Sequence, residues 1–135
     1  MDMKLELVPV PVTDIDRAKA FYVDQVGFVA DHDVPVDENL RFVQLTPPGS
    51  ACSIVLDVNL TAMPAGAQQG LQVVVDDADA AYAYLVGRGV AAEPVVDFPW
   101  GRFTFFADPD GNRCPCSRSS GGRRRRRDEQ LRRRA

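Results

Sequence analysis

The sequence predicts an α+β protein made of two copies of one β-α-β-β-β module, packed into a single domain. At 135 residues the chain has the length of one domain with room for a core. A period this long that occurs only twice is not that of a solenoid. Four pairs of landmarks support this prediction, because they recur in the same order 61–63 residues apart: Val12-Thr13-Asp14 and Val75-Asp76-Asp77, Tyr22 to Gly27 and Tyr84 to Gly89, Arg41-Phe42 and Arg102-Phe103, and Pro48-Gly49 and Asp110-Gly111.

Module one is expected over residues 3–58. Its first strand, residues 5–12, contains Pro9 and Pro11, which we place on a side that needs no ladder hydrogen bond. Thr13 or Asp14 then caps a helix that ends at Gly27, because a glycine favours the left-handed cap conformation. Three strands should follow, at residues 28–36, 40–45 and 53–58.

Module two is expected over residues 70–113, after a linker at residues 59–69. A strand at 71–75 leads to a helix capped by Asp76 or Asp77 and ended by Gly87 and Gly89. Strands are predicted at 90–96 and 103–107. The final strand is missing from the pattern, so the predicted domain covers residues 1–113 and leaves 114–135 as an Arg-rich, disordered tail.

Charge is distributed unevenly along the chain. Residues 1–112 carry 6 Lys/Arg and 17 Asp/Glu, whereas residues 113–135 carry 10 Arg and 2 Asp/Glu, and the whole chain has a net charge of −3. An acidic body argues against nucleic acid as the body's own ligand. The three cysteines have no framework spacing, and the N-terminus lacks the pattern of a signal peptide. We therefore expect a cytoplasmic protein.

Two sequence motifs resemble the glyoxalase, bleomycin resistance protein and extradiol dioxygenase group, known as the vicinal oxygen chelate superfamily. The first runs from Leu7 to Phe28 and includes Arg17-Ala18 and Phe21-Tyr22; the second is Phe105 to Asn112. The resemblance covers residues 3–113. It implies that the modules' sheets curve around a shared cleft, that the protein is a homodimer, and that the cleft holds a ligand or a metal-bound substrate.

Metal-dependent members of that superfamily hold a divalent ion with His and Glu side chains in the cleft. Matching the motifs residue by residue places those ligands at Leu7, Gly70 and Pro115, with Ser53 or Ile54 at the equivalent position of module one. None of these residues has an imidazole or a carboxylate, and such sites need about three ligands of this kind. We therefore expect no metal and no cofactor.

The resulting hypothesis is a protein that binds a small organic ligand in the cleft between the modules. Trp100 can stack on a planar ligand and Arg102 can pair with an anion, although a core or dimer-contact tryptophan and a surface arginine are equally compatible. Gln44 and Gln72 are polar residues within apolar strands and can orient a ligand, or can point to solvent. His32, the only histidine, lies between two aspartates and can titrate, or can be a plain surface residue.

Two alternative functions stay open. The protein could be a lyase, isomerase or dioxygenase of the same superfamily with an unusual metal site or none, in which case His32 is the candidate general base. It could also contact nucleic acid or another anion through its basic tail, residues 114–135. Because the composition of this tail changes where a structural strand is due, we favour instead a GC-rich gene read in an altered frame from about codon 113.

Overall fold

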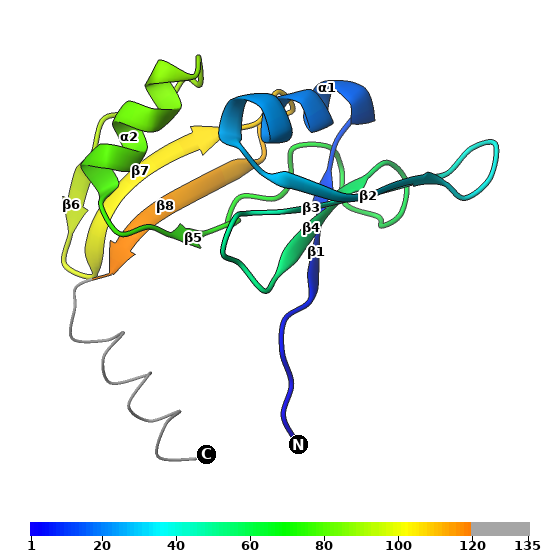
Figure 1. Cartoon of the computed structure of the whole chain (residues 1–135), viewed down its shortest axis with the longest axis horizontal. Coiled ribbons are helices and arrows are strands. Elements are labelled where there is room, and N and C mark those ends of the chain that lie inside the picture. The colour runs from blue at the N-terminus through cyan, green and yellow to red at the C-terminus, as the bar shows by residue number, and fades with distance from the viewer. Residues whose placement is uncertain (120–135) are drawn as a thin grey trace.

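The computed structural model describes residues 1–119, which form two four-stranded sheets with one helical segment over each (Figure 1). Sheet A has the strand order β1-β4-β3-β2 and sheet B has the order β5-β8-β7-β6, so the predicted repeat is confirmed. Module one comprises β1 (Leu7–Pro11), α1 (Ile15–Ala20), the π-helical turn η1 (Phe21–Val26), β2 (Val29–Pro35), β3 (Arg41–Thr46) and β4 (Ser53–Asp57). Module two comprises β5 (Val73–Val74), α2 (Ala78–Gly87), β6 (Val96–Phe98), β7 (Gly101–Ala107) and β8 (Arg113–Ser119).

The helix ends follow the predicted capping residues. Asp14 accepts a hydrogen bond from the Arg17 amide at the start of α1, and Asp77 does the same from the Ala80 amide at the start of α2. Gly27 ends η1 with a positive φ of 99°, as a left-handed cap requires. No helix within residues 1–119 is long and apolar enough to cross a membrane.

The two prolines of β1 lie where no ladder donor is needed. The Ser53 amide donates to the Glu6 carbonyl and the Val12 amide donates to the Asp57 carbonyl, so even-numbered residues of this strand face β4. Pro9 and Pro11 therefore face the outer edge, as expected. Their carbonyls bind the linker and module two. Pro9 accepts from Gln68 and Pro11 accepts from the Gly66 amide, both in the linker, and Pro11 also accepts from Asn112 Nδ2 of module two at 2.7 Å.

The prediction that module two lacks its last strand is wrong. Residues 113–119 form β8 between β5 and β7, so the ordered domain extends past residue 113. The carbonyls of Arg113 and Ser117 accept from the amides of Leu71 and Val75, so odd-numbered residues of β8 face β5. Pro115 has no backbone N–H, and the position where that N–H would lie faces β5, the short edge strand. No hydrogen bond to β7 is therefore lost. The β7 side keeps its pairing from Gly101↔Ser119 to Ala107↔Arg113.

Other segments differ from expectation in extent. The strand expected at 90–96 reduces to β6, which pairs with β7 only from Val96 to Phe98, and β5 is two residues instead of five. Pro94 has no N–H to donate to a neighbouring strand, so it interrupts the strand expected at residues 90–96. The disorder expected for the tail at 114–135 is wrong for residues 114–119, which belong to β8. Residues 120–135 lie outside the part of the chain that is described.

One hydrophobic core joins the two modules. It includes Val10, Leu45 and Tyr22 from module one and Leu85 and Phe106 from module two. Figure 1 shows both helices on the same side of the sheets. Each sheet therefore buries its helix-facing side chains and leaves the other face, here called its open face, without a covering helix.

Candidate functional site

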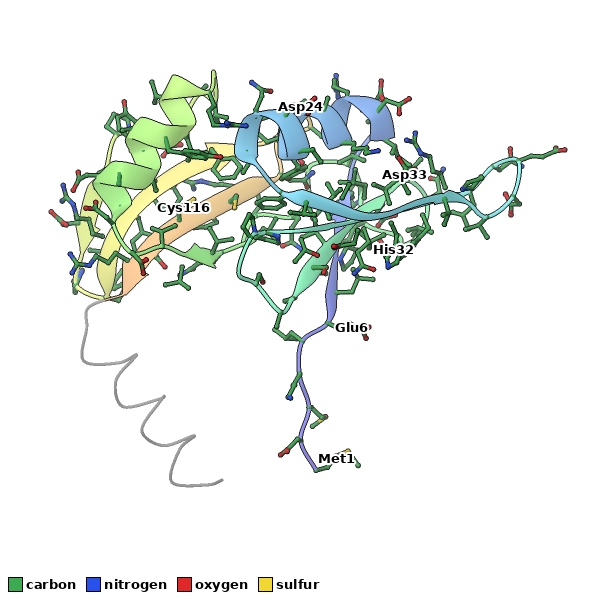
Figure 2. All side chains as sticks on the ribbon, in the orientation of Figure 1. Met1, Glu6, Asp24, His32, Asp33 and Cys116 are labelled. Carbon is green, nitrogen blue, oxygen red and sulfur yellow. The ribbon has the colours of Figure 1, made fainter. Side chains whose placement is uncertain are left out.

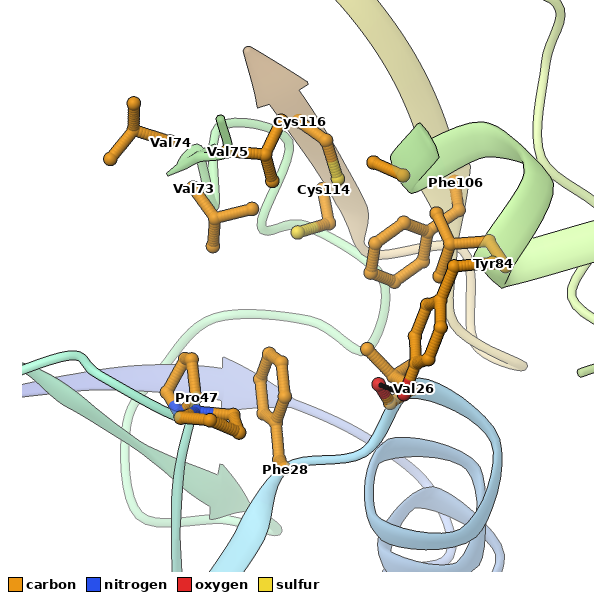
Figure 3. A pocket seen from close by; sticks show the side chains of 13 residues that line it. Val26, Phe28, Pro47, Val73, Val74, Val75, Tyr84, Phe106, Cys114 and Cys116 are labelled. Carbon is orange, nitrogen blue, oxygen red and sulfur yellow. Dashed lines mark hydrogen bonds between the residues drawn. The ribbon is translucent and has the colours of Figure 1, made fainter. Parts of the chain in front are cut away.

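A pocket of about 180 Å³, here called the inner pocket, lies between the two modules (Figure 3). Module one supplies the end of η1, the residue just before β2 and the turn after β3, whereas module two supplies β5, α2 and the buried side of β7 and β8. Its walls are almost entirely apolar. The lining residues that matter below are Phe28, Val73, Ala81, Tyr84, Cys114 and Cys116.

The inner pocket has the size and surface to hold an aromatic ring. A dry apolar cavity of about 150 Å³ is large enough to bind benzene. The hydroxyl of Tyr84 is one of the few polar groups on the wall, and it already donates to the Val26 carbonyl at 3.0 Å. The pocket therefore selects for shape and apolar surface rather than for hydrogen bonding.

A second pocket of about 310 Å³, here called the outer pocket, adjoins the first. The two share Pro47, Pro48, Val73 and Val74 as lining residues, and the outer pocket adds Ser50 and Gln72. The prolines fix the backbone of the turn after β3, so this wall is rigid. Together the inner and outer pockets form the inter-module cleft, which is apolar inside and polar at its outer end.

Gln72 is the predicted site residue that lies in this cleft. Its amide nitrogen donates to the Ser117 hydroxyl at 3.2 Å, which holds the side chain toward the open face of sheet B. The amide thus stands at the boundary between the outer pocket and that face. A polar group of a ligand whose apolar part fills the inner pocket can reach it.

His32 and Gln44 lie opposite each other on β2 and β3, away from both pockets. Val43 and Leu45 of β3 are buried under α1, and the alternation of the strand directs Gln44 to the open face of sheet A. Figure 2 shows His32 on that side of β2 and Asp33 on the helix side. The imidazole packs near the ring of Phe42, with 6.4 Å between centroids.

Trp100 belongs to an aromatic cluster on the open face of sheet B. Its ring stacks on Phe98 at 5.1 Å with an interplanar angle of 8°, and Phe98 meets Phe103 and Phe105 edge to face. Phe98 and Trp100 are 37% and 52% exposed, so two stacked rings are presented to solvent. Such a surface is suited to contact a planar ligand or another protein.

Arg102 points to the helix side of sheet B instead. Its guanidinium pairs with Asp79 of α2 at 2.9 Å and with Asp97 of β6 at 2.7 Å. The hydrogen bonds that it donates to Asp79 and then to Asp97 raise its pKa. Arg41 makes the equivalent pairs with Asp16 and Asp33 in module one, so this arginine belongs to the repeat. The structure therefore separates Arg102 from Trp100.

Sequence reasoning missed the rest of the aromatic cluster and the basic residue beside it. Arg113 lies over the Phe105 ring, 4.2 Å from its centroid, and also pairs with Glu93 at 3.3 Å. The signal was available, because Phe103 and Phe105 are two residues apart in a strand and must share a face. The position of Phe98 across the turn at Trp100 could not be read without the register of β6 and β7.

Comparison with known proteins identifies the family. The profile of the Glyoxalase/Bleomycin resistance protein/Dioxygenase superfamily matches residues 4–114. The chain belongs to this superfamily. Among curated proteins, this superfamily member is 30% identical over 117 residues to the uncharacterized protein YetH of Bacillus subtilis (strain 168), covering 83% of this chain and 95% of that protein.

Two solved structures from Streptomyces sp. CB03234 resemble this superfamily member closely. One is TnmS3, described as an antibiotic binding protein, with 40% identity, a TM-score of 0.81 and coverage of 88% of this chain and 98% of the other. The second is a glyoxalase/bleomycin resistance protein with 41% identity, a TM-score of 0.75 and coverage of 85% and 100%.

The residues at the superfamily's metal positions do not fit a divalent ion. Leu7 and Ser53 are paired across β1 and β4, Pro115 lies in β8, and Gly70 precedes β5. This set offers one hydroxyl and no imidazole or carboxylate. No group of three or more His, Cys, Asp or Glu side chains within residues 1–119 is arranged to hold a metal.

Proposed function

We propose that this protein binds a small, largely apolar organic molecule in the inter-module cleft, without a metal ion and without converting it. The observation that supports this proposal most is the cleft itself: an apolar inner pocket of about 180 Å³ continues into an outer pocket of about 310 Å³ with Gln72 on its wall. Pockets of this kind, apolar with a few placed polar groups, are typical of small-molecule sites. The likeness to TnmS3, described as an antibiotic binding protein, points the same way.

The chemistry of the walls defines the class of ligand. One aromatic ring can occupy the inner pocket between Phe28 and Tyr84, and a polar substituent can then reach the Gln72 amide. The excess of acidic residues over residues 1–112 favours a neutral or cationic ligand over an anion. We therefore expect planar aromatic molecules with one polar or basic substituent to bind best.

A pair of variants on α2 tests whether the ligand occupies the cleft. Ala81 lines the inner pocket and Ala83 is exposed on the same helix, so Ala81→Leu fills the pocket whereas Ala83→Leu does not. A library of planar aromatic amines is screened by native mass spectrometry, and the Kd of the best binder is measured by calorimetry. Ala81→Leu should weaken binding at least about tenfold, equivalent to about 1.4 kcal/mol. Equal Kd values for the two variants would place the ligand elsewhere.

The aromatic cluster around Trp100 supplies a second candidate contact for the ligand, and it is also the basis for proposing a homodimer. Two exposed stacked rings bind either a planar ligand or a second copy of the chain. Trp100→Ala distinguishes these roles when Kd and molar mass by light scattering are measured together. A weaker Kd at unchanged mass assigns Trp100 to the ligand, and a fall in mass at unchanged Kd assigns it to the dimer.

His32 remains the residue to test for the enzymatic alternative, and His32→Ala should leave ligand binding unchanged because its side chain lies outside the cleft.

The alternative of nucleic-acid contact rests on the basic tail, of which residues 120–135 lie outside the described part of the chain. Its test is a DNA affinity that falls steeply with salt and is lost on truncation after Ser119.

A further inference from the structure

The inner pocket carries a pair of thiols that ligand binding does not require. Cys114 and Cys116 are two residues apart in β8, so their side chains lie on the same face of the strand. Both are almost fully buried from bulk solvent, and both line the pocket. Figure 3 shows them together on the wall across the pocket from Phe28 and Pro47.

This pair is badly placed for a disulfide. Alternate residues of a strand are about 6.6 Å apart along the chain, close to the upper limit of the usual Cα separation, and their Cβ bonds are nearly parallel. A disulfide needs the two sulfur atoms to approach to about 2.05 Å. A metal ion that binds both sulfur atoms lies between them, so the two sulfur atoms can stay farther apart than in a disulfide.

We propose that Cys114 and Cys116 form a two-thiolate site for a soft divalent cation, which enters through the inter-module cleft. Each thiol gives up one proton, so the reaction is two thiols plus M²⁺ giving M(SR)₂ plus two H⁺, without any change in oxidation state. The product is neutral, which suits an apolar pocket near the carboxylate of Asp108. Soft cations prefer thiolates, and linear coordination by two of them needs no third ligand.

The two thiols shift each other's pKa in opposite directions. The hydrogen bond between the side chains lowers the pKa of Cys116, against the opposing effect of burial. The same hydrogen bond, together with burial, raises the pKa of Cys114.

Mercury(II) is the probe for this site, and Cys52 is the internal control. Cys52 lies in the turn before β4 and lines neither pocket. The full chain is titrated with HgCl₂ in excess 2-mercaptoethanol, and bound metal is counted by native mass spectrometry. Free protein thiols are counted by a colorimetric reagent after gel filtration has removed the 2-mercaptoethanol. We expect one Hg(II) per chain, two thiols protected and one thiol still reactive.

Three serine variants assign the ligands. Cys52→Ser should bind Hg(II) as the unchanged chain does. Cys114→Ser and Cys116→Ser should each weaken binding by roughly 100-fold, because the second thiol of a pair acts at a high effective concentration. Loss of binding in Cys52→Ser, or retention in either of the other two variants, would overturn the proposal.

Two further measurements on the unchanged chain test the Hg(II) site without relying on a variant that could fail to fold. A third, on Ala81→Leu, separates this proposal from the proposed ligand-binding function. In the unchanged chain with Hg(II) bound, iodoacetamide should label Cys52 alone, and labelling of Cys114 or Cys116 would refute the site. Zn²⁺ should not bind stoichiometrically, since it requires about four ligands, and tight Zn²⁺ binding would overturn the two-ligand assignment. Ala81→Leu should reduce organic ligand binding without removing either thiol, so the two proposals can fail separately.

Discussion

The hydroxyl of Tyr22 in module one donates a buried hydrogen bond of 2.8 Å to Asp108 in module two. The partners are 86 residues apart in the chain. Asp108 also accepts from the amides of Asp110 and Asn112 and from the Asn112 side chain, so one carboxylate organises the turn before β8 and ties it to η1. Burial, and then the charge of Asp108, raises the pKa of Tyr22, which keeps its phenol protonated as a donor.

Tyr22→Phe should therefore destabilise the protein by about 1–3 kcal/mol, since a charged acceptor is left with one partner fewer in a buried place. The measurement is the urea midpoint of unfolding. Tyr84→Phe is the matched control, because the hydroxyl of Tyr84 is solvent-exposed and donates to a backbone carbonyl. Its loss should cost less than 1 kcal/mol, roughly. Equal effects of the two variants would contradict the central role of the Tyr22–Asp108 contact.

Asp33 should make stability fall in acid. Hydrogen bonds from Arg41 and then Lys19 lower the pKa of its carboxyl below the ordinary range. The unfolded chain then binds a proton near pH 4 while the folded chain does not, so this stabilisation is present above about pH 4 and declines as pH falls toward the folded pKa. Asp33→Asn should flatten that part of the stability–pH curve, measured by urea unfolding from pH 2 to pH 6.

The equivalent carboxylate of module two provides the control for this prediction. Asp97 pairs with Arg102, but its side chain is 72% exposed against 23% for Asp33, so water and salt screen the interaction more strongly. Asp97→Asn should leave the acid limb of the curve close to that of the unchanged chain. An unchanged curve in Asp33→Asn would show that the partly buried Arg41–Asp33 contact does not contribute to acid unfolding.

Pro115→Val should extend the pairing of β5. The new amide at position 115 faces β5 and can donate to the carbonyl of Leu71, because the flanking residues Arg113 and Ser117 pair on that side. Amide hydrogen exchange should then show protection at residue 115 and slower exchange at Val73. Pro9→Val is the control, since an amide there faces the outer edge of sheet A and gains no ladder partner; protection in both variants would contradict the register.

Gly66→Ala should be more destabilising than Gly49→Ala, although the two glycines have nearly the same φ, 82° and 83°. A Cβ at residue 66 would lie 2.3 Å from the Asp110 carbonyl oxygen, whereas a Cβ at residue 49 meets no atom within 4 Å. Gly49→Ala should cost about 1 kcal/mol from backbone strain alone. Gly66→Ala should cost at least about 1–2 kcal/mol more, measured by thermal or urea unfolding, because backbone atoms must move.

Local signals in the sequence determined the repeat, the helix caps and the edge role of Pro9 and Pro11. A helix cap depends on one side chain and the amide three residues later, and the two faces of a strand alternate with a period of two residues. Helix caps and strand faces can therefore be predicted from the sequence without the tertiary structure. The same reasoning underestimated β8. A strand already paired with β7 along its other side tolerates one missing donor toward β5, and that depends on register.

Only the tertiary structure decided which candidate site residues share a surface. Gln72 lines the cleft, Trp100 stacks with Phe98 on an open face, and Arg102 is taken up by ion pairs with Asp79 and Asp97. The cleft itself is bounded by turns and strands from both modules, and Cys114 and Cys116 lie on its wall. The sequence determined the two modules because their caps and periods are local, whereas the cleft depends on how the modules pack, which is set by contacts such as Tyr22 with Asp108 across 86 residues.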